Sequence, residues 1–214
     1  MNRIHPAFLI LVLLLVAIPA VGQELQRVGN LNQPAQTVPD ILFGDQTLAY
    51  LIRPYEQISC PEGGFMLQQV GTYLDFSENQ IPGALRVRGG LLRAIPEGSG
   101  FVPGEPYFYG EIVDILIPEP GQYLIEAPVN MWAVPVDEVY FLALHFEGPA
   151  EASLVIDDEP APGIEFINPG NGWIDMFEFD KTSGGKVIIW GDIVCGVVVE
   201  ADASSWSQVK QLFR

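Results

Sequence analysis

Short apolar runs, each closed by a turn rich in proline and glycine, are the feature of this sequence that most limits its fold. Proline removes a backbone donor and glycine is a poor helix former, so a chain broken this often cannot build long helices. Short strands at roughly ten-residue spacing are typical of an all-β sandwich or barrel. The clearest turns are PGEP at 103–106, PEPG at 118–121, PAPG at 160–163 and NPGNG at 168–172.

The apolar runs give the expected strands. Along 139–146, alternation places His145 on the face that we expect to be less buried, as a surface residue. Gly89-Gly90 interrupts another run and suggests a bulge or bend there. The strands are expected at 47–52, 65–76, 84–95, 111–117, 122–126, 139–146, 153–156, 164–167, 174–179, 187–194 and 197–200.

Residues 1–22 have the pattern of a signal peptide. Arg3 gives a positive start, an apolar run extends from Phe8 to Ile18, and small residues precede an expected cleavage before Gln23. An uncleaved anchor is the alternative, but this run is shorter than the ~20 residues that cross a bilayer. We therefore expect a secreted protein (extracellular, periplasmic or at a cell surface) with no membrane span after cleavage.

The mature chain divides by composition into three parts. Residues 23–58 are polar and contain prolines, so we expect an extended lead-in that buries no core of its own. Residues 59–203 hold the strands of the β-sandwich domain. Residues 204–214 carry apolar side chains from Trp206 to Phe213 at helical spacing, which predicts a short amphipathic C-terminal helix.

The only two cysteines, Cys60 and Cys195, both lie in the exported part. An oxidising compartment favours a disulfide between them, which would clasp the two ends of the domain. Two separate buried thiols are one alternative. A nucleophilic thiol is the other, and it would need His145 as its base, because His145 is the only histidine left after cleavage.

Several stretches carry a resemblance to known exported proteins. The ending W-x-x-V-K-x-L-F-R at 206–214 resembles the tail of some exported bacterial proteins. VYFLALHF at 139–146, DDEP at 157–160, NGWIDM at 171–176 and KVIIWGDI at 186–193 are similar to secreted jelly-roll-like modules of surface proteins. The resemblance implies export and a jelly-roll-like antiparallel β-sandwich with a short C-terminal helix. It implies no particular ligand.

Charge and residue content exclude several functions. The net charge of −17 leaves no basic face for nucleic-acid phosphates. His145 alone would have to serve a Ser-His-Asp triad, and no G-x-S-x-G elbow occurs. Zinc lacks ligands. Glycoside hydrolysis needs only two carboxylates, for which Asp114, Asp175 and Glu178 are candidates, although each fits the solvent side of a strand.

Calcium is the inorganic partner that the sequence favours most. Asp157 and Asp158 lie in one acidic turn and Asp175 follows the next connection, so many oxygen ligands lie in adjacent loops. No EF-hand pattern is present, and a solvated acidic turn is the alternative. We take Asp157, Asp158 and Asp175 as the candidate metal ligands.

Aromatic side chains in turn-rich surroundings suggest carbohydrate binding. A planar ring stacks on the apolar face of a sugar, and functional residues concentrate in loops. The candidates are Trp132 in the loop-like segment APVNMWAVP, Trp173 after Asn171-Gly172, and Tyr107 and Tyr109 between two turns. Packing in the sandwich core is the alternative role for such rings.

These features favour an exported, non-catalytic module that binds carbohydrate or another component of a surface or matrix. A self-associating structural protein is the alternative, with an edge strand at 197–199 and the terminal helix as contacts. A glycoside hydrolase is a third possibility, kept because two carboxylates would suffice.

Overall fold

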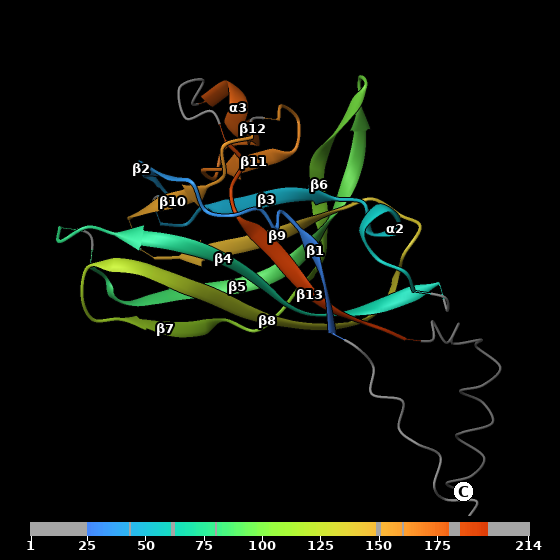
Figure 1. The fold of residues 1–214 in the computed structure, drawn as a ribbon, viewed down its shortest axis with the longest axis horizontal. Helices are drawn as coiled ribbons and strands as arrows, with labels where there is room; N and C mark the ends of the chain where they lie inside the picture. Colours follow the sequence, from blue (N-terminus) through green and yellow to red (C-terminus); the bar gives the residue numbers. More distant parts are fainter. Residues whose placement is uncertain are drawn as a thin grey trace, which may run out of the picture.

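Two antiparallel β-sheets pack face to face in the computed structural model (Figure 1). The structure describes residues 25–42, 44–60, 63–79, 81–148, 151–159, 161–179 and 185–196. The all-β, sandwich class expected from the sequence is confirmed, and helix in this part of the chain is limited to α2 (Pro54–Gln57) and α3 (Met176–Phe179). The expected signal peptide, the strand at 197–200 and the C-terminal helix lie outside the described residues.

The first sheet has the strand order β1-β13-β4-β10-β2, and β8 pairs with the other side of β4. All of these pairs are antiparallel. Its strands are β1 (Leu25–Gly29), β2 (Gln36–Leu42), β4 (Gly64–Phe76), β8 (Gly121–Pro135), β10 (Ala152–Ile156) and β13 (Ile189–Cys195).

The second sheet has the order β12-β11-β3-β9-β5-β6, and β7 pairs with β5. These pairs are antiparallel as well. Its strands are β3 (Thr47–Ile52), β5 (Gly83–Glu97), β6 (Gly100–Tyr109), β7 (Val113–Ile117), β9 (Tyr140–Glu147), β11 (Glu165–Asn168) and β12 (Ile174–Asp175).

The segment 23–58, expected as an extended lead-in, supplies strands to both sheets. β1 pairs with β13 and β2 with β10, while β3 lies between β11 and β9. Every residue of β3 is buried. A segment with too few apolar residues for its own core can still complete one, because its strands form backbone hydrogen bonds with neighbouring strands and pack against the core that those strands build. The sandwich therefore includes residues well before 59.

The second sheet is covered on both faces. One face packs on the core between the sheets, and the other carries a smaller apolar cluster of Ala49, Leu51, Leu92, Phe141, Ala143 and Phe166. Phe101, Val102 and Tyr109 of β6 and Trp173 pack against this cluster. The His145 face of β9 is the less buried of its two faces, as expected, because His145 and Glu147 are half-buried while every residue of the other face is buried. It is not exposed throughout, since Phe141 and Ala143 on the same face are fully buried. His145 itself is half-buried.

The bulge considered at Gly89-Gly90 is absent from the pairing of β5 with β9, which runs without a register shift from Arg86 to Arg93. A Cβ at Gly89 would lie 2.7 Å from the Ala127 carbonyl oxygen, and one at Gly90 would lie 2.3 Å from the Tyr109 ring. Both glycines are needed for this close packing.

The disulfide between Cys60 and Cys195 is confirmed, with a Cα–Cα distance of 5.2 Å across 135 residues of sequence. It joins the segment before β4 to the end of β13. Since β13 pairs with β4 along its whole length, the bridge locks the first sheet at one end.

Replacing both cysteines in the Cys60→Ala/Cys195→Ala variant should lower the free energy of unfolding by about 4–5 kcal/mol, because a loop of this length is no longer closed in the unfolded chain. Urea unfolding of the two proteins measures the difference. The wild type with reductant is the control, and it should match the variant. A variant as stable as the oxidised wild type would contradict this role of the bridge.

Candidate functional site

The structure separates the two tyrosines that the sequence proposed as ligand-binding residues. The pairing of β5 with β6 shifts between Leu91 and Leu92, so Tyr107 is an extra residue in β6. Tyr107 consequently packs towards the core between the sheets, with its ring 6.0 Å from that of Tyr140. Tyr109 lies over the outer cluster, below the Arg88 guanidinium at 4.6 Å.

The two proposed tryptophans also lie in different places. Trp173 precedes β12 and packs, half-buried, against the outer apolar cluster of the second sheet. Trp132 lies on β8 of the first sheet, and 66% of its surface is exposed. Of the four aromatic candidates, Trp132 is the one with a freely accessible ring.

The segment around Trp132 is a strand rather than the expected loop. β8 pairs with β4 through two register shifts, one on each side of the Leu67–Met131 pair. Asn130 (φ 55°) and Ala133 (φ 60°) adopt left-handed backbone at these irregularities. The bulges bend the strand around Trp132, and alanine in this conformation costs on the order of 1 kcal/mol.

A hollow of about 400 Å³ opens beside this strand, between the end of β6 and β8. Asn130, two residues before Trp132, forms part of its wall. The wall combines aromatic rings with one carboxylate and one amide, and it consists of Phe108, Tyr109, Gly110, Glu111, Pro128, Val129 and Asn130. This is the mixture of apolar and polar groups that binding sites for small molecules use.

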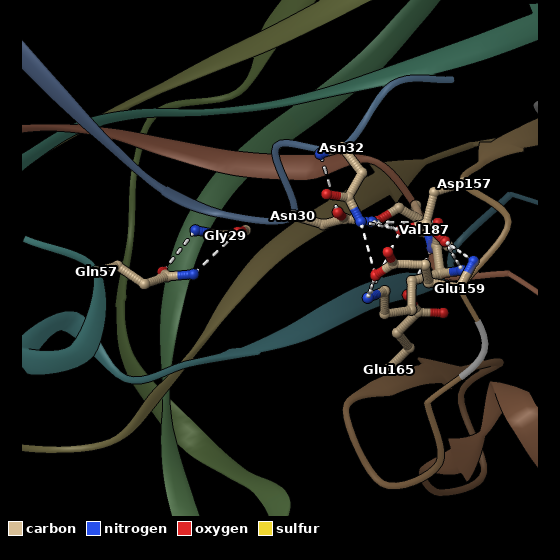
Figure 2. A network of polar contacts seen from close by, with 9 residues as sticks. Gly29, Asn30, Asn32, Gln57, Asp157, Glu159, Glu165 and Val187 are labelled. Atoms are coloured by element: carbon tan, nitrogen blue, oxygen red, sulfur yellow. Dashed lines mark hydrogen bonds and ion pairs between the residues drawn. The ribbon is translucent and has the colours of Figure 1, made fainter. Parts of the chain in front are cut away.

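Asp157, proposed as a metal ligand, is fully buried and already surrounded by protein donors (Figure 2). One carboxylate oxygen accepts from the backbone N–H of Glu159 at 2.9 Å and of Lys186 at 2.7 Å. The other accepts from the side-chain amides of Asn30 at 3.0 Å and Asn32 at 2.8 Å. Burial opposes ionisation, but these hydrogen bonds together hold the pKa of Asp157 below its ordinary value.

The other two proposed metal ligands do not join it. Asp158 is exposed on the same turn. Asp175 accepts from the backbone N–H of Gly163 at 2.9 Å and of Phe177 at 3.0 Å, and so fixes the turn into α3. Within the described residues, no three His, Cys, Asp or Glu side chains gather in a group suited to a metal ion. Calcium binding therefore stays a prediction without a defined ligand set.

Glu165 is a buried carboxyl group that sequence reasoning missed. It begins β11, 5% of its surface is exposed, and it accepts a hydrogen bond from the backbone N–H of Val187. Burial raises the pKa of Glu165 to about 8, the Val187 N–H opposes this, and the nearby Asp157 charge adds to it. A glutamate within the apolar-polar run IEFIN gives no sequence signal for such burial.

The residues considered for catalysis have structural partners. His145 Nδ1 lies 2.9 Å from Thr47 Oγ1, and burial, with the charge of Arg88, lowers the pKa of His145. Asp114 is exposed and pairs with Arg86 at 3.5 Å. The Glu178 side chain lies outside the described residues.

No protein-family model matches the sequence, and the comparison with curated proteins found no relative. Two solved structures are similar in fold. One is a crystal structure of the cysteine protease and lectin-like domains of Cwp84, a surface layer associated protein of Clostridium difficile, with TM-score 0.50 and 14% identity over 72% of this chain. The other is an alanine variant of the clostridial cysteine protease Cwp84 after propeptide cleavage, with TM-score 0.52 and 10% identity over 80% of this chain.

This chain spans 33% and 40% of the length of those two chains. At such low identity the likeness shows the sandwich fold and no shared residue role. In the described part of the chain, no helix is both long and apolar enough to cross a membrane.

The Glu165→Gln variant should become more stable than the wild type as pH rises from about 4.5 to about 8. A carboxyl group whose pKa is raised by folding stabilises the fold below its unfolded pKa, and that contribution disappears as pH rises through the folded pKa. Glutamine still accepts from the Val187 N–H but cannot ionise. Urea unfolding at acid, neutral and alkaline pH measures the effect.

The control is Glu159→Gln, which removes a carboxylate from the exposed side of the same network. If the advantage of Glu165→Gln over the wild type did not change with pH, a raised pKa for this group would be refuted.

The Asp157→Ala variant should lose about 3–5 kcal/mol of unfolding free energy, because four N–H donors and the nearby Lys186 ammonium lose a fully buried acceptor. The same loss is expected with calcium and with a chelator, since the donors belong to the protein. Asp158→Ala, its exposed neighbour, is the matched control. If calcium raised the melting temperature of the wild type but not that of Asp157→Ala, Asp157 would instead be assigned as a metal ligand.

Proposed function

We propose that this protein is an exported, non-catalytic β-sandwich module that binds carbohydrate at a cell surface or in a matrix. The fold supports this proposal, because one similar structure includes a lectin-like domain of a surface layer associated protein. The Cys60–Cys195 disulfide fits an oxidising compartment outside the cell.

The site that supports the proposal is the exposed ring of Trp132 together with the hollow that begins at Asn130. An indole stacks on the apolar face of a sugar ring, and its breadth gives a large contact area. Glu111 and Asn130 in the wall of the hollow can accept from and donate to hydroxyl groups. The rings of Phe108, which is 41% exposed, and Tyr109 add apolar surface.

The observation that carries the proposal is the presentation of Trp132. A large aromatic side chain gains free energy by burial, yet this one is held in solvent by a strand whose flanking residues adopt left-handed backbone. Strained backbone of this kind concentrates at binding sites, where surrounding contacts fix it. A purely structural strand would need neither feature.

Self-association is the second candidate function. β7 and β8 lie at sheet edges within the described part of the chain, and Leu116 on β7 is 71% exposed. An exposed edge strand with apolar side chains can pair with a second copy. The solution mass of the samples used below distinguishes this candidate from a monomeric binding module.

The Trp132→Ala variant should bind its carbohydrate at least about tenfold more weakly than the wild type, a loss of about 1.4 kcal/mol. A glycan array identifies the ligand, and titration calorimetry measures the affinity. Leu124→Ala on the same strand removes another exposed apolar side chain and is the matched control, with no expected change. If both variants bound the ligand as the wild type does, the Trp132 site would be wrong.

A further inference from the structure

A groove surrounds the segment 30–34, which joins β1 to β2, and it shares no lining residue with the hollow beside Trp132. It consists of two hollows of about 450 and 280 Å³. Four residues line both hollows, so the two are neighbours that meet along this segment: Arg27, Asn30, Leu31 and Asn32.

The larger hollow is polar and draws its walls from both sheets. Tyr50 comes from β3 of the second sheet, Gln57 from α2, and Lys186 from the segment before β13. Gln57 is held firmly, since its Oε1 accepts from the Gly29 N–H at 2.9 Å and its Nε2 donates to the Gly29 carbonyl at 3.1 Å. Figure 2 shows this pair beside the Asp157 network.

The two asparagines that line both hollows are fixed as well. Asn30 is 4% exposed, and its amide donates to Asp157 and to the Val187 carbonyl at 2.9 Å. Asn32 is exposed, and its amide donates to Asp157 at 2.8 Å. Side chains held in this way lose little conformational entropy when a ligand binds.

The smaller hollow supplies an aromatic wall. Tyr73 and Trp190 lie 5.4 Å apart between ring centroids, and both line it. A Cβ at Gly71 would lie 2.6 Å from the indole, so glycine is required below the ring. The half-exposed Arg27 guanidinium lies over the indole, 5.0 Å from the ring centroid.

Trp190 also carries an unused donor. Its indole Nε1 is buried and has no hydrogen-bond partner within the described part of the chain. A buried donor without an acceptor costs about 1–3 kcal/mol. A ligand oxygen that reaches the edge of the indole from the smaller hollow would satisfy it.

The charges of the groove are balanced locally. Arg27 pairs with Asp192 at 2.6 Å, and Lys186 pairs with Glu159 at 3.2 Å. An anionic ligand would meet no free cation here and would be repelled by a chain of net charge −17. Amides, a phenol and an aromatic wall suit a neutral ligand that is rich in hydroxyl groups.

We propose that the groove around Asn30–Pro34 is a second binding site, which takes a neutral oligosaccharide laid across Leu31 with one sugar unit in each hollow. The proposal shares the ligand class of the proposed function but none of the residues of the Trp132 site. Either site can therefore fail while the other stands.

The test uses the mature chain and two readouts. A glycan array compares the wild type with Trp132→Ala, Leu31→Arg and the double variant. Leu31→Arg places a long side chain over both hollows at a position that is 55% exposed, so folding is preserved. Leu25→Arg, on β1 at 52% exposure and outside both hollows, is the matched control. NMR then follows the indole N–H signal of Trp190, assigned with Trp190→Phe, during titration with lactose, maltose, cellobiose and diacetylchitobiose at millimolar concentration.

The expected result is a saturable shift of the Trp190 signal with at least one disaccharide, in the wild type, Trp132→Ala and Leu25→Arg but not in Leu31→Arg. On the array, Trp132→Ala should keep binding that the double variant loses. The absence of any Trp190 shift, or a shift that Leu31→Arg leaves unchanged, would overturn the groove. Array binding lost with Trp132→Ala alone, without a Trp190 shift, would leave the proposed function standing and remove this site. A Trp190 shift together with array binding that Trp132→Ala leaves unchanged would support the groove and contradict the Trp132 site.

Discussion

The carboxylate of Asp157 joins three segments of the chain: the turn after β10, the segment before β13 and the segment after β1. It follows β10, it accepts from Lys186 ahead of β13, and it accepts from Asn30 and Asn32 after β1. Between β10 and the segment before β13, strand pairing is limited to an isolated bridge of Ile156 with Val187. A buried anion with this many N–H donors fixes the positions of all of them at once, because each donor left without it would be unsatisfied. The shape of the groove around 30–34 depends on this one group.

Glu165 extends the same arrangement to the second sheet. It begins β11 and accepts from Val187, the residue next to Lys186, so two carboxyl groups bind consecutive backbone N–H groups. The two groups differ in charge because their surroundings differ. Asp157 has four N–H donors and stays ionised, whereas Glu165 accepts from the Val187 N–H and lies beside that charge, and its burial favours the neutral form near neutral pH. The sheets are thus tied at this edge with one buried negative charge rather than two.

The sequence predicted the class of fold and the disulfide because both depend on local or pairwise signals. Turns recur at strand spacing, and each of the two cysteines has one possible partner within the chain. It predicted the strand at 47–52, which is β3, but it missed β1 and β2, because short polar strands are recognised only by the sheet they complete. It placed Trp132 in a loop, since bulges at Asn130 and Ala133 resemble loop sequence. It could not find Asn30, Asn32 or Trp190 as groove residues, because their closeness depends on contacts across more than a hundred residues of chain.

Charge balance explains why a strongly acidic protein can hold a site for a neutral ligand. Repulsion among 27 acidic side chains favours solubility and acts over the whole surface, but it is screened beyond about 10 Å at moderate ionic strength. Within that range the groove contains its own compensating cations, Arg27 and Lys186, each paired with a carboxylate. A ligand with no net charge neither gains nor loses from the distant field, so its affinity is decided by the amides, the phenol and the rings that the Asp157 network positions. The same acidity that excludes nucleic acid therefore leaves recognition of a neutral sugar untouched.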